Sequence, residues 1–235
     1  MLFISIAFRL TSQSEYIYNS ILSTYVSENG NVNYKGLLKE DARFDHYLDK
    51  MSESPPAEND LSDYAKAYWI NAYNAFTIRL IIDNYPLESI TDLHPFFYIP
   101  FFNTVWHDEF FQIGEEYFSL DKIEHDILRE KFNDPRIHFA INCASKSCPN
   151  LLNEEYTSDK LDEQLNTQVK KFLNDKTKNK IGSNKLELSE IFDWFEDDFD
   201  AYGGVIPFID RYTDINIEEN AEISFLPYDW SLNEF

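Results

Sequence analysis

Basic residues, cysteines and long apolar runs are scarce in this sequence of 235 residues, and each shortage excludes a class of protein. Its 20 lysines and arginines stand against 42 aspartates and glutamates, a formal net charge of −22 with the histidines taken as neutral. A field of this sign repels phosphate backbones and anionic lipid head groups. We therefore expect no nucleic acid among its partners. Two cysteines are too few to imply an oxidising compartment.

No segment reaches the ~18 uninterrupted apolar residues of a membrane-spanning helix, so we expect no membrane span. The N-terminal "MLFISIAFRL" is apolar only up to Arg9, and it lacks the basic start, longer core and small-residue cleavage site of a signal peptide. We interpret residues 1–15 as an N-terminal stub that could be the remnant of a leader. We expect a soluble protein, cytoplasmic or, if a leader has been lost, extracytoplasmic. Its oligomeric state stays open.

The abundant residues are apolar, at 43%, and aromatic, at 17%, which excludes disorder. In the first half, apolar residues recur at helical spacing. The clearest case is "DLSDYAKAYWINAYNAFTIRLIIDNYP", residues 60–86, where Pro86 ends the pattern. The spacing there predicts a central, mostly buried helix.

The second half mixes predicted strands and helices. Strand patterns lie at 109–120, as a hairpin turning near Gly114, and at 136–142, 184–189 and 223–230. Helical patterns lie at 120–132 with Ser119 as cap, and at 158–175, 190–199 and 203–213. We predict one α+β domain over residues 16–235, with a helix-rich N-terminal half packed on a small, mainly antiparallel sheet from the second half.

Both cysteines lie in "RIHFAINCASKSCPNL", residues 136–151. A reactive thiol needs a pKa lowered by a neighbouring histidine or cation, and His138, Arg136 and Lys146 are close in sequence to Cys143. Three alternatives stay open, namely a buried apolar cysteine, a disulfide between Cys143 and Cys148, and a zinc site with His138. Zinc would need a fourth ligand from elsewhere and no second cysteine pair exists, so we predict neither metal nor cofactor.

Polar residues within the apolar patterns are the other candidates. Asn71 and Asn74 are three residues apart and lie on the same side of the predicted helix, where they either brace backbone or line a pocket. His125 follows Glu124 in a helical pattern and is either a structural histidine or a base for a cysteine nucleophile.

The acidic run "DWFEDDFDAYGG" has Ile209 where a calcium loop needs a bidentate glutamate. Phosphate-loop and serine-hydrolase motifs are absent.

Five segments together resemble a known family. They are "YWINAYNAFTIRLII", "SLDKIEHDILR", "DPRIHFAINCASKSCPNL", "LSEIFDWFEDDF" and "YDWSLN". In this order they are similar to the family called domain of unknown function 547, from about Tyr16 to Asn233. The resemblance implies a single α+β module, found in bacteria and plants, without an assigned reaction.

The family's motif residues carry over as Asn71, Asn74, His125, His138, Asn142 and Cys143. Cys148 matches the bacterial form of the motif, whereas the plant form has serine in that region. Bacterial members often have a full secretion signal, which this N-terminus does not match. Every histidine precedes Cys143, the reverse of the papain order, and a permuted papain- or transglutaminase-like arrangement would accommodate this by analogy.

Two functions of different classes follow. In the first, Cys143 is the nucleophile of an acyl transferase or amide hydrolase acting on a small molecule or peptide. His125 or His138 is its base, and Asn71, Asn74 and Asn142 are substrate-binding residues. In the second, the protein is a non-catalytic acidic recognition module. Its aromatic segment Phe96–Phe102 would then contact a peptide, glycan or partner protein.

Overall fold

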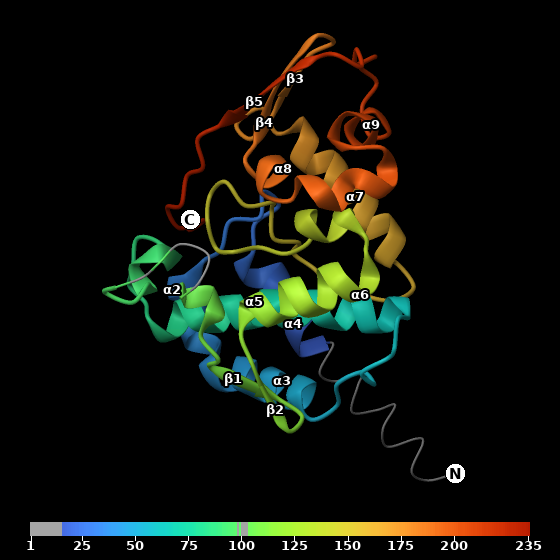
Figure 1. Ribbon diagram of the computed structural model, residues 1–235. Helices are drawn as coiled ribbons and strands as arrows, with labels where there is room; N and C mark the ends of the chain where they lie inside the picture. Colours follow the sequence, from blue (N-terminus) through green and yellow to red (C-terminus); the bar gives the residue numbers. More distant parts are fainter. Residues whose placement is uncertain (1–15, 98, 100–102) are drawn as a thin grey trace.

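The computed structural model describes residues 16–97, 99 and 103–235, and these form the predicted α+β fold of many helices and two small sheets (Figure 1). The predicted stub at residues 1–15 lies outside the described residues. Within the described ranges, none of the helices combines the length and apolarity that crossing a bilayer requires.

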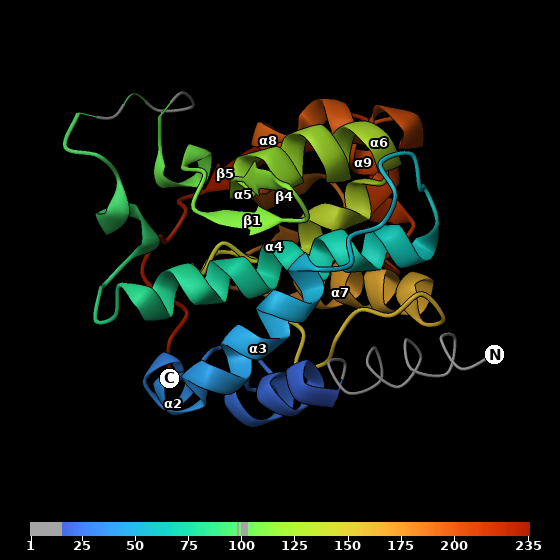
Figure 2. The same ribbon diagram turned by 90° about the horizontal axis from the view of Figure 1, so that it is seen from below.

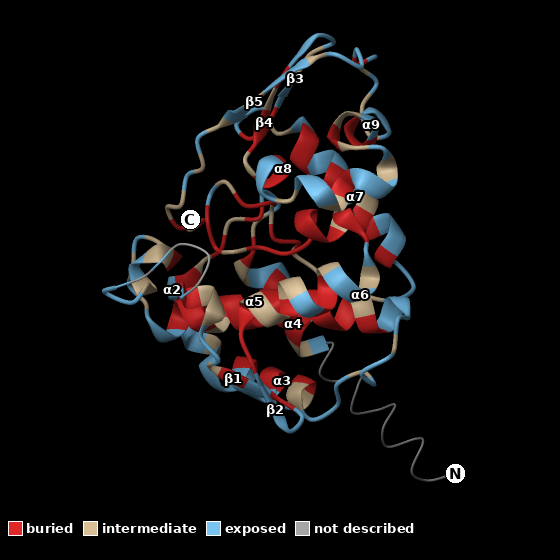
Figure 3. Ribbon diagram, in the orientation of Figure 1, coloured by how far each residue is buried: buried red, intermediate tan, exposed pale blue. Residues whose placement is uncertain are grey.

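Helix α4, Asp63–Asp83, is the central element, as the spacing predicts. Ser62 caps it by accepting a hydrogen bond from the Ala65 N–H. Most of its residues are buried on every side (Figure 3). A helix at 16–25, α2 (Tyr34–Leu37) and α3 (Asp41–Ser52) belong to the same half of the molecule, whose hydrophobic core they share with α4 (Figure 2). The short η1 (Leu38–Glu40), which has no buried residue, connects α2 to α3.

Short elements follow α4 on the side of the molecule where the cavity described below opens. They are η2 (Ile90–Leu93), η3 (Val105–His107), and the antiparallel hairpin of β1 (Phe111–Ile113) and β2 (Glu116–Phe118). Gly114 turns the hairpin with a φ of +61°, a conformation that glycine adopts without strain. The predicted hairpin and its turn are confirmed.

The predicted helix at 120–132 is present but irregular. Ser119 caps it by accepting from the Lys122 N–H. It runs through α5 (Leu120–Lys122), η4 (Ile123–Arg129) and α6 (Glu130–Phe132). The middle element is a π-helix. Such wider turns are rare and are frequent at functional sites.

The strand predicted at 136–142 is wrong. Residues Pro135–Phe139 form a 3₁₀ helix, η5, started by Asp134, whose carboxylate accepts from the Arg136 N–H, and by proline at the first helical position. An apolar run of this length fits a strand as well as a buried helical turn, and in the structure every residue from Ile137 to Asn142 is buried. The alternation of buried and exposed residues that marks a strand with one solvent-facing side is therefore absent from this segment.

The second half holds the larger sheet, in the order β3 (Lys180–Ile181), β4 (Lys185–Ser189) and β5 (Glu222–Leu226). The first pair is antiparallel and the second parallel, so this sheet is mixed. It shares a second hydrophobic cluster with α7 (Leu161–Asn174), α8 (Ile191–Trp194), η6 (Glu196–Tyr202) and α9 (Val205–Asp210). The predicted strand at 223–230 ends at Leu226.

After β5 the chain returns to distant parts of the fold. Isolated bridges pair Ser231 with Ser89, Leu232 with Ser145, and Glu234 with Val32. The Ser145 bridge places this segment beside the cysteine loop.

Candidate functional site

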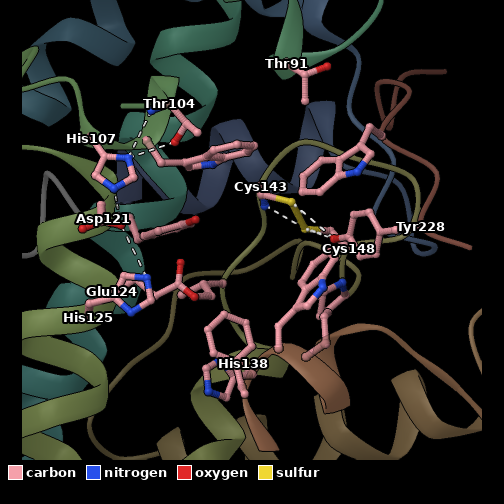
Figure 4. A pocket seen from close by; sticks show the side chains of 18 of the residues that line it. Thr91, Thr104, His107, Asp121, Glu124, His125, His138, Cys143, Cys148 and Tyr228 are labelled. Atoms are coloured by element: carbon pink, nitrogen blue, oxygen red, sulfur yellow. Dashed lines mark hydrogen bonds and ion pairs between the residues drawn. A yellow bond between two sulfur atoms is a disulfide. The ribbon is translucent and has the colours of Figure 1, made fainter. Parts of the chain in front are cut away.

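A cavity of about 780 Å³ lies between the two halves of the fold (Figure 4), within the roughly 300–1,000 Å³ of small-molecule sites. Segments far apart in the sequence line it. The lining residues are Tyr73, Thr91, His94, Thr104, Trp106, His107, Asp121, Glu124, His125, His138, Ile141, Cys143, Cys148, Pro149, Ile191, Trp194, Phe195, Tyr228 and Trp230.

A disulfide between Cys143 and Cys148 forms one wall. Cys143 is half-buried and Cys148 is 5% exposed. The Cys143 N–H donates to Cys148 Sγ at 2.9 Å, and the Tyr228 hydroxyl donates to the same sulfur at 3.2 Å. Tyr228 also lies 3.5 Å from Cys143 Sγ, and Ser145 Oγ lies 3.3 Å from it. Of the alternatives open for the cysteines, the structure therefore has the disulfide.

The opposite wall carries a chain of polar contacts (Figure 4). Arg129 donates to His125 Nδ1 at 2.6 Å. A guanidinium has donors only, so the ring proton of His125 is on Nε2, which lies 3.4 Å from Asp121 Oδ1. The same carboxylate oxygen is 3.5 Å from His107 Nε2. His107 Nδ1 in turn is 2.9 Å from Thr104 Oγ1.

His138 contributes its ring to the cavity but directs Nε2 elsewhere. That nitrogen lies 2.6 Å from Asp198 Oδ2, and Asp198 is not a lining residue. Arg129 forms a bidentate pair with Asp198 at 2.6 and 2.8 Å. Burial acts to raise the pKa of Asp198, but hydrogen bonds from His138 and Arg129 outweigh it and hold the pKa well below its usual range. The His138 ring stacks on Phe195 with centroids 4.1 Å apart.

Glu124 points its carboxylate into the cavity from the π-helix (Figure 4). Burial raises the pKa of Tyr73 well above its ordinary value, and the negative charge of Glu124 raises it further. The pKa of Tyr228 is also raised, first by burial and then by Glu124. Both tyrosines therefore keep their hydroxyl protons and can donate hydrogen bonds.

The cavity brings together Cys143, His125 and His138, the three residues predicted to be catalytic. The two histidines lie across the cavity from the disulfide (Figure 4). Neither forms a hydrogen bond to Cys143 among the residues that the structure describes.

The three asparagines predicted to bind substrate are not among the lining residues, and they brace backbone instead. Asn71 is hydrogen-bonded to both the N–H and the C=O of Tyr156. Asn74 donates to the Ala140 C=O and accepts from the Asn142 N–H. The Asn142 side chain donates to the Pro149 C=O and accepts from the Ala144 N–H. Asn74 thereby ties the start of the cysteine loop to helix α4, and Asn142 braces the loop itself.

Sequence reasoning missed several cavity residues. Asp121 and Glu124 belong to a helical pattern that gives no sign of a cavity. Asp198, which contacts His138 beside the cavity, belongs to the acidic run that fails as a calcium loop. Tyr228 and Trp230 were assigned to a strand, although the segment "YDWSLN" that contains them is one of the five that resemble the family. The resemblance of this motif to the family was the feature of the sequence that could have identified Tyr228 and Trp230 as site residues.

The aromatic segment predicted as an alternative binding surface is partly described. Phe96 is 92% exposed and Phe97 is 83% exposed, with their rings in edge contact at 4.8 Å. Residues 98 and 100–102 lie outside the described residues.

In the described part of the chain, no group of three or more histidine, cysteine, aspartate or glutamate side chains is arranged to hold a metal ion.

Comparison with known proteins gives one match. Residues 59–173 match the model of a family described as protein of unknown function, DUF547. No curated protein and no solved structure matches the chain, so the permuted papain- or transglutaminase-like arrangement stays a prediction.

Proposed function

The chain belongs to the DUF547 family, whose description names no reaction, and we propose a function from the cavity. We propose that it is the active site of a cysteine-dependent acyl transferase or amide hydrolase. Cys143 is the nucleophile, and it becomes available when an external thiol reduces its disulfide with Cys148.

The position of Cys143 carries this proposal. Its side chain is half-buried in the cavity wall, whereas Cys148 is 5% exposed, so Cys143 is the sulfur that a bound substrate meets. Glu124 and His125 line the opposite side. A substrate between the walls therefore has a nucleophile on one side and proton-transferring groups on the other.

The reaction begins with reduction. Two thiols of the reductant become a disulfide, and Cys143 and Cys148 each gain a proton. Glu124 then takes the proton of the Cys143 thiol, the thiolate attacks the substrate carbonyl carbon, and a C–S bond forms. The Tyr228 hydroxyl, 3.5 Å from Cys143 Sγ, is placed to donate to the resulting oxyanion. The C–N or C–O bond breaks, and the leaving group takes the proton that Glu124 accepted from Cys143, with the His125 Nε2–H as a hydrogen-bond donor to it.

In the second half of the reaction, water or an acceptor amine attacks the thioester. Glu124 takes its proton, the C–S bond breaks, and Glu124 passes that proton to the departing sulfur, which restores the Cys143 thiol. His138 is the second candidate base. Asp198 orients it through Nε2, and its Nδ1 has no hydrogen bond among the described residues.

The test uses purified protein with and without a thiol reductant, a chromogenic acyl ester, and iodoacetamide labelling mapped by mass spectrometry. We expect ester turnover and Cys143 labelling in the reduced wild type and in Cys148→Ser, where no disulfide can form. Cys143→Ser is expected to lose turnover at least 100-fold. Undiminished turnover in Cys143→Ser, or equal turnover in the oxidised protein, would overturn the proposal.

A second candidate function rests on the exposed pair Phe96 and Phe97. Neighbouring exposed aromatic rings mark surfaces that bind partners, which supports a recognition module for a protein or peptide. The double variant Phe96→Ser/Phe97→Ser is expected to abolish partner capture without changing ester turnover. The exposed Tyr117→Ser is the control, and equal capture by wild type and double variant would rule this candidate out.

A further inference from the structure

The charges and aromatic rings of the cavity differ between its two sides. Among the described lining residues, the carboxylates are Asp121 and Glu124, and no lysine or arginine is present. Apart from the tyrosines, the other ionisable groups are His94, His107, His125 and His138. Asp121 is shared between His107 and His125, so Glu124 is the carboxylate directed at a ligand.

The other side presents a continuous aromatic surface. Trp230 lies at its centre, with ring centroids 5.5 Å from Trp106, 5.8 Å from Trp194 and 4.5 Å from Tyr228. Three of the four tryptophans of the chain therefore line this one cavity. Such a surface accepts the planar or apolar body of a ligand and attracts cations.

We propose that the ligand of this cavity is an amphipathic cation, an amine whose apolar body packs on Trp106, Trp194 and Trp230 while its ammonium group pairs with Glu124. An anionic ligand would meet two carboxylates without a lysine or arginine partner. This inference rests on the proposed function in that it names the substrate class of the same cavity. In the acyl-transfer reaction, the amine is either the leaving group or the acceptor.

The net charge of −22 concentrates cations around the whole molecule, and the test separates this effect from Glu124 itself. Glu124→Gln and Asp126→Asn each remove one negative charge. Asp126 is an exposed residue of the same π-helix and does not line the cavity. The general attraction of cations to the protein falls equally in both variants, whereas a direct contact with Glu124 is lost only in Glu124→Gln.

The probes are 2-phenylethylamine, 2-phenylethanol and 3-phenylpropionate, which share an aromatic body and differ in charge. Binding is followed by NMR of the indole N–H groups in the oxidised protein. Trp106, Trp194 and Trp230 report on the cavity, and the buried Trp69, which does not line it, is the internal control. We expect the amine to bind about tenfold more tightly than the alcohol, and the carboxylate to bind more weakly still.

Glu124→Gln is expected to remove the preference of amine over alcohol, and Asp126→Asn to retain it. Equal affinities for the three probes, or equal losses in both variants, would overturn the inference. If Glu124→Gln does not fold, Glu124→Ala replaces it with the same expectation. Because binding is measured on the disulfide form, amine binding without ester turnover after reduction overturns only the proposed function. Turnover without an amine preference overturns only this inference.

Discussion

At the scale of single residues, Tyr228 is the side chain that touches both sulfurs, at 3.2 Å from Cys148 and 3.5 Å from Cys143. A hydrogen bond to a charged group contributes about 1.5–3 kcal/mol, and a donor favours the thiolate form. In the reduced protein, Tyr228→Phe should therefore move the pH midpoint of thiol alkylation upward by about one unit. Alkylation rates against pH, resolved by peptide, measure this. Tyr212→Phe, which loses a hydrogen bond to Asn166, is the control, and unchanged midpoints at both cysteines would contradict the role of Tyr228.

Asp198 gives a pH dependence of stability. Its folded-state pKa lies below the ~3.9 of an unfolded aspartate. The resulting stabilisation is complete above that value and is lost as the pH falls below it toward the folded-state pKa. Asp198→Asn is expected to lower the free energy of unfolding by about 2 kcal/mol at pH 7, with a smaller difference from wild type at pH 3. Urea unfolding at both pH values measures this. The exposed Asp200→Asn should cost little, and a pH-independent difference for Asp198→Asn would contradict the ion-pair account.

Residue types alone predicted only some of the side chains that line the cavity around Cys143. Cys143, His125 and His138 stand out because thiols and imidazoles are the groups that do acyl chemistry, and all three line the cavity. Glu124 could not be distinguished from other glutamates in the sequence, because its place in the cavity depends on the direction in which the π-helix points it. Among 42 aspartates and glutamates, nothing in the sequence separates Asp121 and Glu124, which line the cavity, from the rest.

At the scale of elements, the asparagines hold the cysteine loop on helix α4. Asn74→Ala leaves the buried Asn142 N–H and Ala140 C=O without their partner, at about 1–3 kcal/mol each. We expect the free energy of unfolding to fall by about 3 kcal/mol, and iodoacetamide labelling of the reduced cysteines to become less selective for Cys143. Asn174→Ala is the control, since Asn174 makes an exposed contact to Lys170 at the end of α7. Equal losses in both variants would contradict a special role for Asn74.

Periodicity predicted the long elements well and the short buried ones poorly. Helices α4 and α7 follow from apolar spacing, because each has enough turns for the pattern to repeat. The segment 136–142 could not be assigned in this way, since its backbone forms hydrogen bonds within a short 3₁₀ turn and to the Asn74 side chain rather than to a neighbouring strand. The π-helix at Ile123–Arg129 could not be predicted either, because the spacing of its apolar residues fits an ordinary α-helix equally well.

At the scale of the whole molecule, the net charge of −22 sets the response to salt. Like charges on a folded surface repel, and ions screen this repulsion. Raising sodium chloride from 10 to 300 mM should increase the thermal unfolding temperature by about 3 °C for each kcal/mol of repulsion removed. Arg79 contacts Asp41, Asp45 and Asp83, and screening weakens this cluster, but the excess of acidic residues outweighs it. Differential scanning calorimetry measures the change, and a lower unfolding temperature in salt would show that ion pairs dominate instead.

The cavity itself was beyond the reach of the sequence for a geometric reason. Its lining extends from Tyr73 to Trp230, and only the completed fold brings these segments together. The α+β class could be predicted because it depends on element types, whereas the site depends on how the two halves meet.

The distance in sequence between the cysteines and Tyr228 has a consequence for synthesis on the ribosome. Tyr228 follows Cys148 by 80 residues. At about 5–20 residues per second, the cysteines emerge roughly 4–16 s before the tyrosine that contacts both sulfurs. Throughout this interval the nascent chain carries two thiols without their tyrosine contact. The redox conditions around the emerging chain, rather than those around the finished protein, then decide whether these thiols first pair with each other.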